Sequence, residues 1–517
     1  MFQMNSTMIS PPQALSQLTE HQLKAAYPIL DYLTNPSDLH YIRFKGFAGT
    51  GKTFTLAAIL QAYQELFPKA VVAMTAPTHK AVKQLRKNAA GSKNVIFGTI
   101  HSLLGLKERI DSKTGNRTFE NDNYLSKQSK IDEALVLIID EASMLPKDLF
   151  QKIMNYQASK KGMYELKIIF TGDPKQLPPV NEVFSSAFIS HLLYNSQEYV
   201  LSQPMRQTAD SNILTFATAI RDTQEDVSYK DFLGDDLVRI DTEQFQSEIL
   251  PMFGEPFDLN SDHIKILAYT NEAVRQMNQL VRQYRLQESC PPKIVAGDFF
   301  VADDPIFDMK HPLKPIIVSN SEELLIEDCT KVEVPIKWNV SKSLQEIKSE
   351  LRVKAVGENE IAKELWVDNA IKKGFAVTSS VMSHTFFMYK CNVVVYRLND
   401  AMEEVPYRYT IWVIHEDSEI YFKQVIAALE QIAHKAYDRT AAWREFYNFQ
   451  KLSASISPNY ALTIHKSQGS TYKNCVLLMD TVDSLKRVVS GKDTKLFERT
   501  CLRYVGVSRA KEKLFIL

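Results

Sequence analysis

The chain has 517 residues, of which 45% are hydrophobic and 24% are charged. Lysine plus arginine and aspartate plus glutamate each total 61, so the formal net charge is +0 at pH 7. At about 100–200 residues per domain the length predicts three or four domains, and the neutral balance excludes binding of nucleic acid through bulk positive charge. Any nucleic acid would have to bind in a local positive groove.

The five cysteines are widely spaced and include no Cys-x-x-Cys pair, which favours a reducing compartment and argues against a zinc site. The first six residues lack a basic region followed by a long apolar one. No apolar run approaches the ~18 residues of a membrane span. We therefore expect a soluble, cytoplasmic protein that does not associate with a membrane.

A glycine-rich segment at residues 46–53, Gly-Phe-Ala-Gly-Thr-Gly-Lys-Thr, lies between an apolar run at 41–44 and a helical pattern that begins at residue 54. Its glycines let the backbone bend so that successive N–H groups converge on a polyphosphate, and the helix N-terminus adds its positive end. Lys52 is placed to reach the outer phosphates and the Thr53 hydroxyl to ligate Mg²⁺. The alternative is a surface turn, but the strand-to-helix setting favours a nucleoside triphosphate site formed by Gly46, Gly49, Thr50, Gly51, Lys52 and Thr53.

Four further apolar runs predict buried parallel strands, at residues 70–75, 95–97, 134–139 and 166–171. With residues 41–44 they give five strand candidates and intervening helices, which is the pattern of a nucleotide-binding α/β lobe. The polar segment 106–119 carries a Thr-Gly-Asn turn. It predicts a protruding hairpin inserted in this lobe.

The run at 134–139 ends in Asp140 and Glu141. An acid at the end of a central strand can hold Mg²⁺, usually through water, and its neighbour can take a proton from the attacking water. Two acids can also be a solvated strand end, but the phosphate loop upstream favours the functional interpretation. The next strand leads into a segment rich in turn-forming residues, 172–180, which predicts a rigid loop that positions Asp173 or Gln176.

An amphipathic helix is predicted near the N-terminus. Thr19 is placed to cap this helix. The local pattern alone predicts that Gln22, in its first turn, is an exposed helix residue.

A second sheet is predicted in the C-terminal half, and it is split along the chain. It begins with a strand at 264–269, resumes near Tyr460, continues at 476–479 and closes at 513–516. A sheet interrupted in this way implies an inserted domain, which we expect to run from about residue 297 to about residue 453.

The expected insertion contains alternating stretches at 332–336 and 392–397, which predict strands of a small barrel. Its later part has helical periodicity and many aromatic residues, which could stack on bases. Trp443, Phe446 and Tyr447 fall on one helix face, however, and this favours core packing. The acids of the insertion form no convincing metal cluster, so we do not expect a nuclease.

Six segments occur in the order seen in superfamily 1 helicases: residues 46–53, 140–144, 172–178, 203–207, 461–471 and 504–511. The details resemble the RecD-like branch and, within it, the phage Dda-type helicases. The segments that carry this closer resemblance are 18–22, 99–102, 297–300 and 504–509. The resemblance spans essentially the whole chain, although it is strong only at the motifs and weak between about residues 300 and 450.

The resemblance implies residue roles that spacing alone does not supply. Gln22 is similar to the glutamine that recognises adenine, and Gln176 to the sensor that couples the γ-phosphate to DNA. Arg206 and Arg509 resemble the two arginines that reach the γ-phosphate from the cleft side. The positions that resemble single-strand contacts are Pro77, His79, Thr99 and His101 in the first lobe and Thr463 and His465 in the second.

The resemblance also implies an α/β fold with two RecA-like parallel-sheet lobes. A β-hairpin would be inserted in the first lobe, and a small β-barrel plus a helical arm that touches this hairpin in the second. The expected boundaries are 1–97 and 131–205 for the first lobe, 98–130 for the hairpin, 206–296 and 454–517 for the second lobe, and 297–453 for the insertion.

The activity implied by the resemblance is that of an ATP-dependent DNA helicase, which uses ATP and Mg²⁺ to move 5′→3′ on single-stranded DNA and unwinds duplex in replication, recombination or repair. Its partners would be duplex junctions and replication or recombination proteins. We expect a monomer in the cytoplasm of a bacterium or a phage-infected host. Phe119, near the hairpin tip, would either split the duplex by stacking on the last base pair or anchor the hairpin. Two alternatives stay open: an RNA helicase of the same superfamily, and a phosphate-loop NTPase switch.

Overall fold

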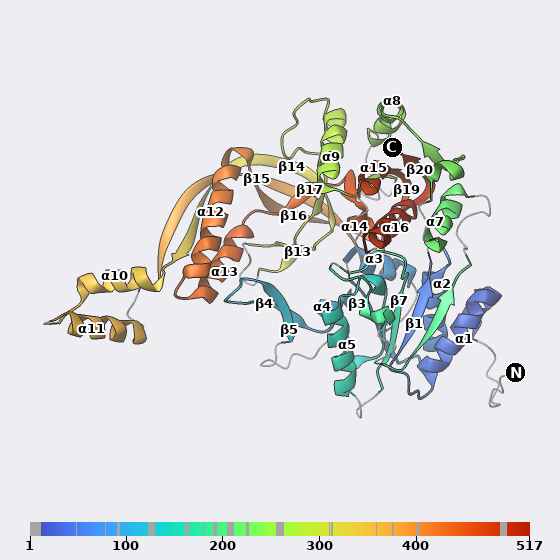
Figure 1. Cartoon of the computed structure of the whole chain (residues 1–517), viewed down its shortest axis with the longest axis horizontal. Helices are drawn as coiled ribbons and strands as arrows, with labels where there is room; N and C mark the ends of the chain where they lie inside the picture. Colours follow the sequence, from blue (N-terminus) through green and yellow to red (C-terminus); the bar gives the residue numbers. More distant parts are fainter. Residues whose placement is uncertain are drawn as a thin grey trace.

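The computed structural model describes residues 12–47, 49–77, 79–89, 94–121, 130–160, 165–179, 181–189, 194–203, 211–223, 227–254, 263–309, 311, 314–357, 359–374, 377–399, 403–485 and 494–517. Two lobes, each built on a parallel sheet, lie one above the other, and an inserted domain extends from them to one side (Figure 1). The predicted α/β class with two RecA-like lobes is confirmed. None of the helices in the described ranges combines the length and apolar character that a membrane span requires.

The first lobe contains a six-stranded parallel sheet in the order β3-β2-β6-β7-β1-β8. Its strands are β1 (Tyr41–Gly46), β2 (Val71–Ala76), β3 (Val95–Thr99), β6 (Ala134–Ile139), β7 (Lys167–Gly172) and β8 (Ser196–Leu201). Five of them match the predicted strands. The sixth, β8, was not predicted, because at the sheet edge its sequence Ser-Gln-Glu-Tyr-Val-Leu is largely polar.

The helices of the first lobe pack on this sheet and complete its core. They include α1 (Glu20–Thr34), α2 (Lys52–Leu66), α3 (His79–Asn88), the short α4 (Ile100–Leu103) and α5 (Lys147–Lys160). Apolar side chains from both faces of the sheet are buried in two clusters, as expected of a parallel sheet covered on both sides. The carboxyl ends of β1, β2, β6 and β7 therefore meet at one edge, where polar residues gather.

The predicted hairpin of the first lobe consists of β4 (Leu106–Ile110) and β5 (Arg117–Asn121), which pair antiparallel. Its turn contains Gly115 in a left-handed conformation with φ +76°, and a Cβ at this position would collide with the ring of Trp443. The Tyr447 hydroxyl donates a hydrogen bond of 2.7 Å to the Gly115 carbonyl. The turn is thus docked on the inserted domain. Phe119 lies within β5, opposite Glu108, rather than in the turn.

The second lobe contains a five-stranded parallel sheet in the order β18-β10-β19-β20-β9. Its strands are β9 (Leu237–Arg239), β10 (Ile264–Ala268), β18 (Ala461–Thr463), β19 (Tyr472–Leu477) and β20 (Ala510–Ile516). Its helices include α7 (Asn212–Asp222), α9 (Asn271–Leu286), α14 (Ile464–Ser467) and α16 (Thr494–Val507). Neighbouring strands β10 and β18 are far apart in sequence, which confirms that the sheet is interrupted by an insertion.

The inserted domain is built on an antiparallel sheet in the order β16-β15-β14-β11-β17. The strands are β11 (Phe299–Ala302), β14 (Glu323–Ser341), β15 (Ser379–Leu398), β16 (Glu404–Ile414) and β17 (Ile456–Pro458). The sheet curls towards closure, since the Ala454 N–H donates a bond of 2.7 Å to the carbonyl of Trp412 in β16. The two predicted stretches of this barrel belong to β14 and β15, which are much longer than expected.

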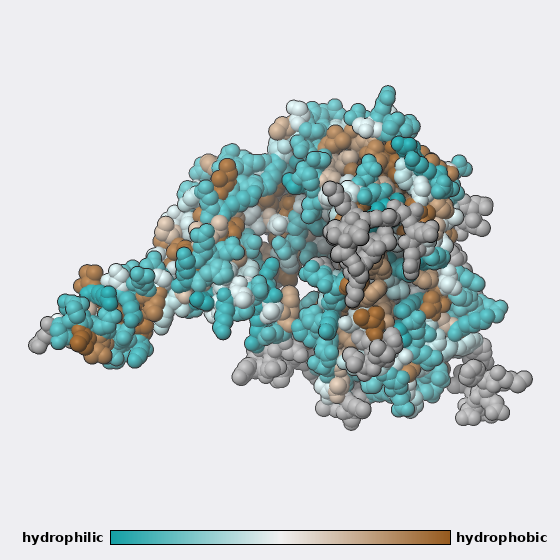
Figure 2. Space-filling view, in the orientation of Figure 1, coloured by the Kyte–Doolittle hydropathy of each residue, from teal (hydrophilic) through white to brown (hydrophobic). Residues whose placement is uncertain are grey.

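Beyond the barrel, β14 and β15 continue as a twisted ribbon that ends in a distal arm, α10 (Leu344–Lys354) and α11 (Glu360–Lys372) (Figure 1). Apolar side chains are exposed on this arm (Figure 2). They include Val353, Val356 and Ile361, which are 88%, 75% and 73% exposed.

Two further helices, α12 (Glu416–Lys435) and α13 (Arg439–Gln450), lie along the ribbon. Trp443, Phe446 and Phe449 of α13 are buried in one apolar cluster, and Tyr447 packs against it. The prediction of core packing is confirmed for these aromatic residues. The insertion reaches the hairpin of the first lobe through α13, whereas the distal arm points away (Figure 1).

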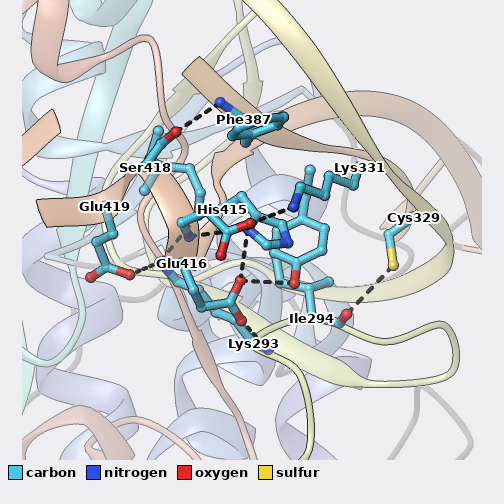
Figure 3. Close-up of polar contacts among 12 residues, drawn as sticks. Lys293, Ile294, Cys329, Lys331, Phe387, His415, Glu416, Ser418 and Glu419 are labelled. Atoms are coloured by element: carbon cyan, nitrogen blue, oxygen red, sulfur yellow. Dashed lines mark hydrogen bonds and ion pairs between the residues drawn. The ribbon is translucent and has the colours of Figure 1, made fainter. Parts of the chain in front are cut away.

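The start of α12 is fixed by a network of hydrogen bonds and ion pairs (Figure 3). The Lys293 N–H donates a bond of 2.6 Å to Glu416, and the Lys293 ammonium lies 2.8 Å from Glu419. The Phe387 N–H donates a bond of 2.8 Å to the Ser418 hydroxyl. These contacts join α12 both to β15 and to the segment after α9, so the helix and the barrel form one unit.

Candidate nucleotide and nucleic-acid site

A cavity of about 470 Å³ opens between the two lobes. The first lobe lines it with the glycine-rich turn, the acidic end of β6 and Gln176. The second lobe lines it with residues 469–471 and 508–511. The fold thus brings together, around one cavity, the predicted residues Gly46, Gly49, Thr50, Gly51, Lys52, Thr53, Asp140, Glu141, Gln176 and Arg509.

The glycine-rich turn has the conformation that its sequence predicts. Gly49 and Gly51 adopt left-handed φ angles of 77° and 76°, which glycine tolerates best. A Cβ on Gly46 would lie 2.9 Å from the Thr50 hydroxyl oxygen and 3.0 Å from the Lys52 Cβ. The close approach of these segments therefore requires glycine. The chain enters α2 at Lys52, so the N-terminus of this helix points at the cavity.

Lys52 and the acidic end of β6 form a buried charge cluster. The Lys52 ammonium lies 3.2 Å from Oδ1 of Asp140, and each side chain is only 12% exposed. Burial disfavours the charge on Lys52, but the carboxylates of Asp140 and Glu141 outweigh this effect and raise the pKa of the ammonium. Lys52 therefore stays protonated and can bind a polyphosphate.

Within this cluster, Glu141 has a strained backbone conformation and a buried carboxylate whose burial is only partly compensated by nearby charge. Its φ of 51° places a non-glycine residue in the left-handed region, a form of strain that tends to occur at functional sites. Burial raises the pKa of its carboxyl, and the nearby charge of Lys52 offsets this only in part. Oε2 of Glu141 is buried without a hydrogen-bond partner among the described residues. A water molecule bound in the cavity would satisfy it.

The loop after β7 is where the two lobes make polar contact. Oδ2 of Asp173 accepts a hydrogen bond of 2.7 Å from the Tyr504 hydroxyl, and Oδ1 accepts one of 3.0 Å from the Lys175 N–H. Burial raises the pKa of Asp173, although the bond from Tyr504 opposes this. Nearby, Nε2 of Gln468 lies 3.4 Å from Oε1 of Gln176. The rigid loop predicted from the sequence is therefore also an interlobe contact.

Of the two arginines predicted for the second lobe, Arg509 lies within the described residues. Arg509 is 4% exposed. It is held by its own lobe, through bonds of 3.0 Å to the Val505 carbonyl, 2.9 Å to the Ser470 carbonyl and 2.9 Å to the Ser508 hydroxyl. Arg206 lies outside the described residues.

Gln22 does not have the exposure that its local pattern predicts. Its side chain is 2% exposed, because Oε1 accepts a bond of 3.1 Å from the Thr19 N–H in a capping box at the start of α1. The expectation of an exposed helix residue is wrong, whereas the predicted cap by Thr19 is confirmed. Gln22 is not among the residues that line the cavity between the lobes.

A cation–π contact near the cavity was not predicted. The guanidinium of Arg221, at the end of α7, lies 4.2 Å from the ring centroid of Phe47. Phe47 follows β1 in the first lobe and lines the cavity, as do Ile213 and Leu214 of α7. This pair joins the lobes beside the phosphate loop. Its two residues lie far apart in sequence, so no local pattern indicates it.

The candidate single-strand residues occupy matching places in the two lobes. Thr99 ends β3 and caps α4, and Thr463 ends β18 and caps α14. His101 and His465 are the second residues of these two short helices. Burial lowers the pKa of both His101 and His465. A neutral His101 can act through hydrogen bonding or stacking rather than through charge.

The remaining candidates lie near these helices. Pro77 directly follows β2. His79 opens α3, and its side chain lies outside what is described. The Phe119 ring is 40% exposed, and its centroid lies 4.6 Å from that of His101. This packing is compatible with the anchoring role, and the exposed part of the ring leaves the strand-splitting role open.

Comparisons with known proteins agree with this geometry. A family model described as an AAA domain matches residues 17–239. The ATP-dependent DNA helicase dda of Enterobacteria phage T4 is 22% identical over 96% of this chain and 98% of its own. An uncharacterized protein, R530, of Acanthamoeba polyphaga mimivirus is 26% identical over 96% of this chain and 98% of its own.

A third relative and one solved structure extend the comparison. The RecBCD enzyme subunit RecD of Buchnera aphidicola is 23% identical over 91% of this chain and 68% of its own. The crystal structure of Pif1 helicase from Candida albicans is 15% identical, with a TM-score of 0.43 over 97% of this chain and 94% of that chain.

The ordered motifs and the two parallel-sheet lobes around one cavity make the chain similar to superfamily 1 helicases. Its similarity to the Dda and RecD proteins extends over more than nine-tenths of the chain.

Proposed function

We propose that the protein is an ATP-dependent DNA helicase, which moves along single-stranded DNA and separates the duplex ahead of it. One observation carries this proposal. The cavity between the lobes has Lys52 and Glu141 on one wall and Arg509 on the other. Closure of this cavity on a nucleotide would move the two lobes, and with them the two sets of candidate strand contacts, relative to each other.

ATP with Mg²⁺ fits the residues of the first wall. The backbone N–H groups of the turn and the Lys52 ammonium are donors for phosphate oxygens. The Thr53 hydroxyl and the Asp140 carboxylate are oxygen ligands of the kind that Mg²⁺ prefers, the carboxylate through water. When bound, the magnesium nucleotide supplies the phosphoanhydride bond that drives the motor.

Hydrolysis would use residues from both walls. Oε2 of Glu141, which has no hydrogen-bond partner among the described residues, would orient water and take its proton. Arg206 and Arg509 would stabilise the charge on the transferred phosphoryl group. Gln176 would sense the γ-phosphate, and its contact with Gln468 supports a coupling role at the lobe boundary. Gln22 would contact the adenine, and its side chain would have to leave the capping box to do so.

The strand would be held at two places whose affinities alternate. Pro77, His79, Thr99 and His101 form the candidate grip of the first lobe, and Thr463 and His465 that of the second. Contacts with phosphates would be independent of sequence and sensitive to salt. The hairpin would meet the duplex ahead of the first grip. We also propose that the hairpin domain spans residues 98–130 and the insertion residues 297–453. The motor would act as a monomer and move 5′→3′.

The experiment that tests unwinding and its direction is strand displacement with ATP on two duplexes of identical sequence. One carries only a 5′ single-stranded tail and the other only a 3′ tail. We expect displacement of the duplex with the 5′ tail. Displacement of only the 3′-tailed duplex would refute the direction, and displacement of neither, with the ATPase active, would refute unwinding.

A further inference from the structure

An ionic bridge joins α3 of the first lobe directly to the barrel of the inserted domain. Oε1 of Glu404, at the start of β16, lies 2.7 Å from the Lys87 ammonium and 3.3 Å from that of Lys83. The Lys83 ammonium also donates a hydrogen bond of 3.2 Å to the carbonyl of Tyr396 in β15. Burial opposes the charge on Glu404, yet the two lysines outweigh it and lower the pKa of the carboxyl. The bridge is therefore charged at neutral pH.

A second bridge joins the first lobe to the same domain at another place. The turn of the hairpin docks on α13 through the bond between Tyr447 and Gly115. The guanidinium of Arg117 lies 5.0 Å from the centroid of the Tyr447 ring, and Ile110 packs against the apolar cluster of the inserted domain. In Figure 1 α13 and the hairpin lie side by side, well to the left of α3.

The candidate residues of the first-lobe grip lie close, along the chain, to the elements that carry these bridges. Pro77 lies two residues before the start of α3, which carries the first bridge, whereas Thr99, at the end of β3, and His101, in α4, precede the hairpin, which carries the second. In the second lobe, Lys466, next to His465, pairs at 2.7 Å with Asp303 of the inserted domain. The inserted domain is therefore fastened beside both candidate grips.

Building on the proposed function, we infer that the single strand runs through a passage between the first lobe and the inserted domain. The two bridges close this passage on either side. The bridge of Lys83 and Lys87 with Glu404 is its gate, through which an internal segment of a strand enters. A strand with a free end can instead thread through the closed passage.

The two bridges differ in chemistry, and this identifies which one opens. The lysines of the first bridge are 41% and 43% exposed, whereas Glu404 is 17% exposed, so salt can screen these ion pairs from the side of the lysines. The contact of the hairpin with α13 includes an ion pair of 3.7 Å between Lys451 and Glu108, but it also buries aromatic and aliphatic surface, which salt does not weaken. The gate therefore lies at Glu404 rather than at the hairpin.

A reversible crosslink across the gate tests the inference. In a Cys290→Ser background, which removes the exposed native cysteine, Lys83→Cys and Glu404→Cys are joined by a bis-maleimide whose spacer contains a disulfide. ATPase is then measured with a linear single-stranded oligonucleotide and with a covalently closed circle of the same composition. The control is the Glu404→Cys single variant treated with the same reagent.

We expect the ATPase of the crosslinked protein to be stimulated by the linear strand but not by the circle. Reduction of the spacer should restore stimulation of the ATPase by the circle. Equal stimulation by the circle before and after reduction would overturn the inference, as would equal loss on both substrates. If the protein without the crosslink is stimulated by neither substrate, the proposed function fails instead of the gate.

Charge reversal tests the gate without a crosslink. Glu404→Lys places three ammonium groups together, so the gate should stay open and the rate of dissociation from the circle should rise severalfold at low salt. Glu403→Lys is the matched control, since Glu403 bonds to Asn399 within the turn rather than to α3. Equal dissociation rates for the two variants would contradict the gate.

Discussion

The hydroxyl of Tyr504 in the second lobe donates a hydrogen bond of 2.7 Å to Oδ2 of Asp173 in the first. Both side chains are buried, with exposures of 2% and 1%. Asp173 begins the loop that carries Gln176, and Tyr504 lies one helical turn before the segment that carries Arg509. The bond therefore ties the candidate sensor of one wall to the candidate arginine of the other.

Tyr504→Phe removes this bond and keeps the aromatic ring in the core. A lost hydrogen bond to a charged group costs about 1.5–3 kcal/mol, so we expect the DNA-stimulated kcat to fall roughly ten- to a hundredfold. The KM for ATP should change little, because neither residue contacts the proposed phosphate site directly. Asp173→Asn keeps an acceptor for the hydroxyl and should be milder. An unchanged kcat in Tyr504→Phe would show that the bond does not position the site.

The raised pKa of Glu141 gives the ATPase a predicted pH dependence. The carboxyl must be ionised to accept a proton from water, and burial raises the pH at which it ionises. Activity should therefore fall on acidification at a higher pH than an ordinary glutamate would cause. Glu141→Gln should lower kcat about 10²–10⁴-fold, abolish this acidic limb and retain nucleotide binding. The pH profile of kcat for both proteins is the measurement, and an unchanged acidic limb in Glu141→Gln would assign the base elsewhere.

Arg206 can be tested although it lies outside the described residues. Arginines that stabilise a transferring phosphoryl group are worth on the order of 10³–10⁵ in rate. Arg206→Ala should therefore bind ATP, measured with a fluorescent analogue, yet hardly hydrolyse it. DNA-stimulated hydrolysis that survives the substitution would mean that the role is misassigned.

Substitution of Phe119 tests whether its ring splits the duplex or anchors the hairpin. If its exposed ring stacks on the last base pair, Phe119→Ala should hydrolyse ATP normally on single strands and displace duplex poorly. Thr118→Ala is the matched control, because adjacent residues of a strand point to opposite faces. Duplex displacement by Phe119→Ala at the rate of this control would leave only the anchoring role beside His101.

Local patterns predicted the parts of the fold whose cause is local. The phosphate loop, the buried strands and the hairpin each need a particular run of residues, and all three lie where they were predicted. Edge strands β8 and β9 were missed, because they are polar or short. The buried state of Gln22 was missed as well, because it depends on a capping box rather than on amphipathic spacing.

Contacts between the lobes could not be predicted from the sequence. The pairs formed by Tyr504 with Asp173 and by Arg221 with Phe47 join segments far apart in the chain. The docking of Gly115 on α13 is of the same kind. Such pairs exist only when two independently formed surfaces meet, so no periodicity or spacing within one segment indicates them.

In the proposed motor, ATP hydrolysis in the cleft is coupled to a single strand of DNA. This coupling is measured as the steady-state ATPase rate without polynucleotide, with single-stranded DNA and with single-stranded RNA, beside the Lys52→Ala variant. We predict strong stimulation by DNA, weaker stimulation by RNA, and no activity in Lys52→Ala under any condition. Stimulation by RNA equal to or above that by DNA would indicate an RNA helicase, and an ATPase indifferent to both would contradict a motor.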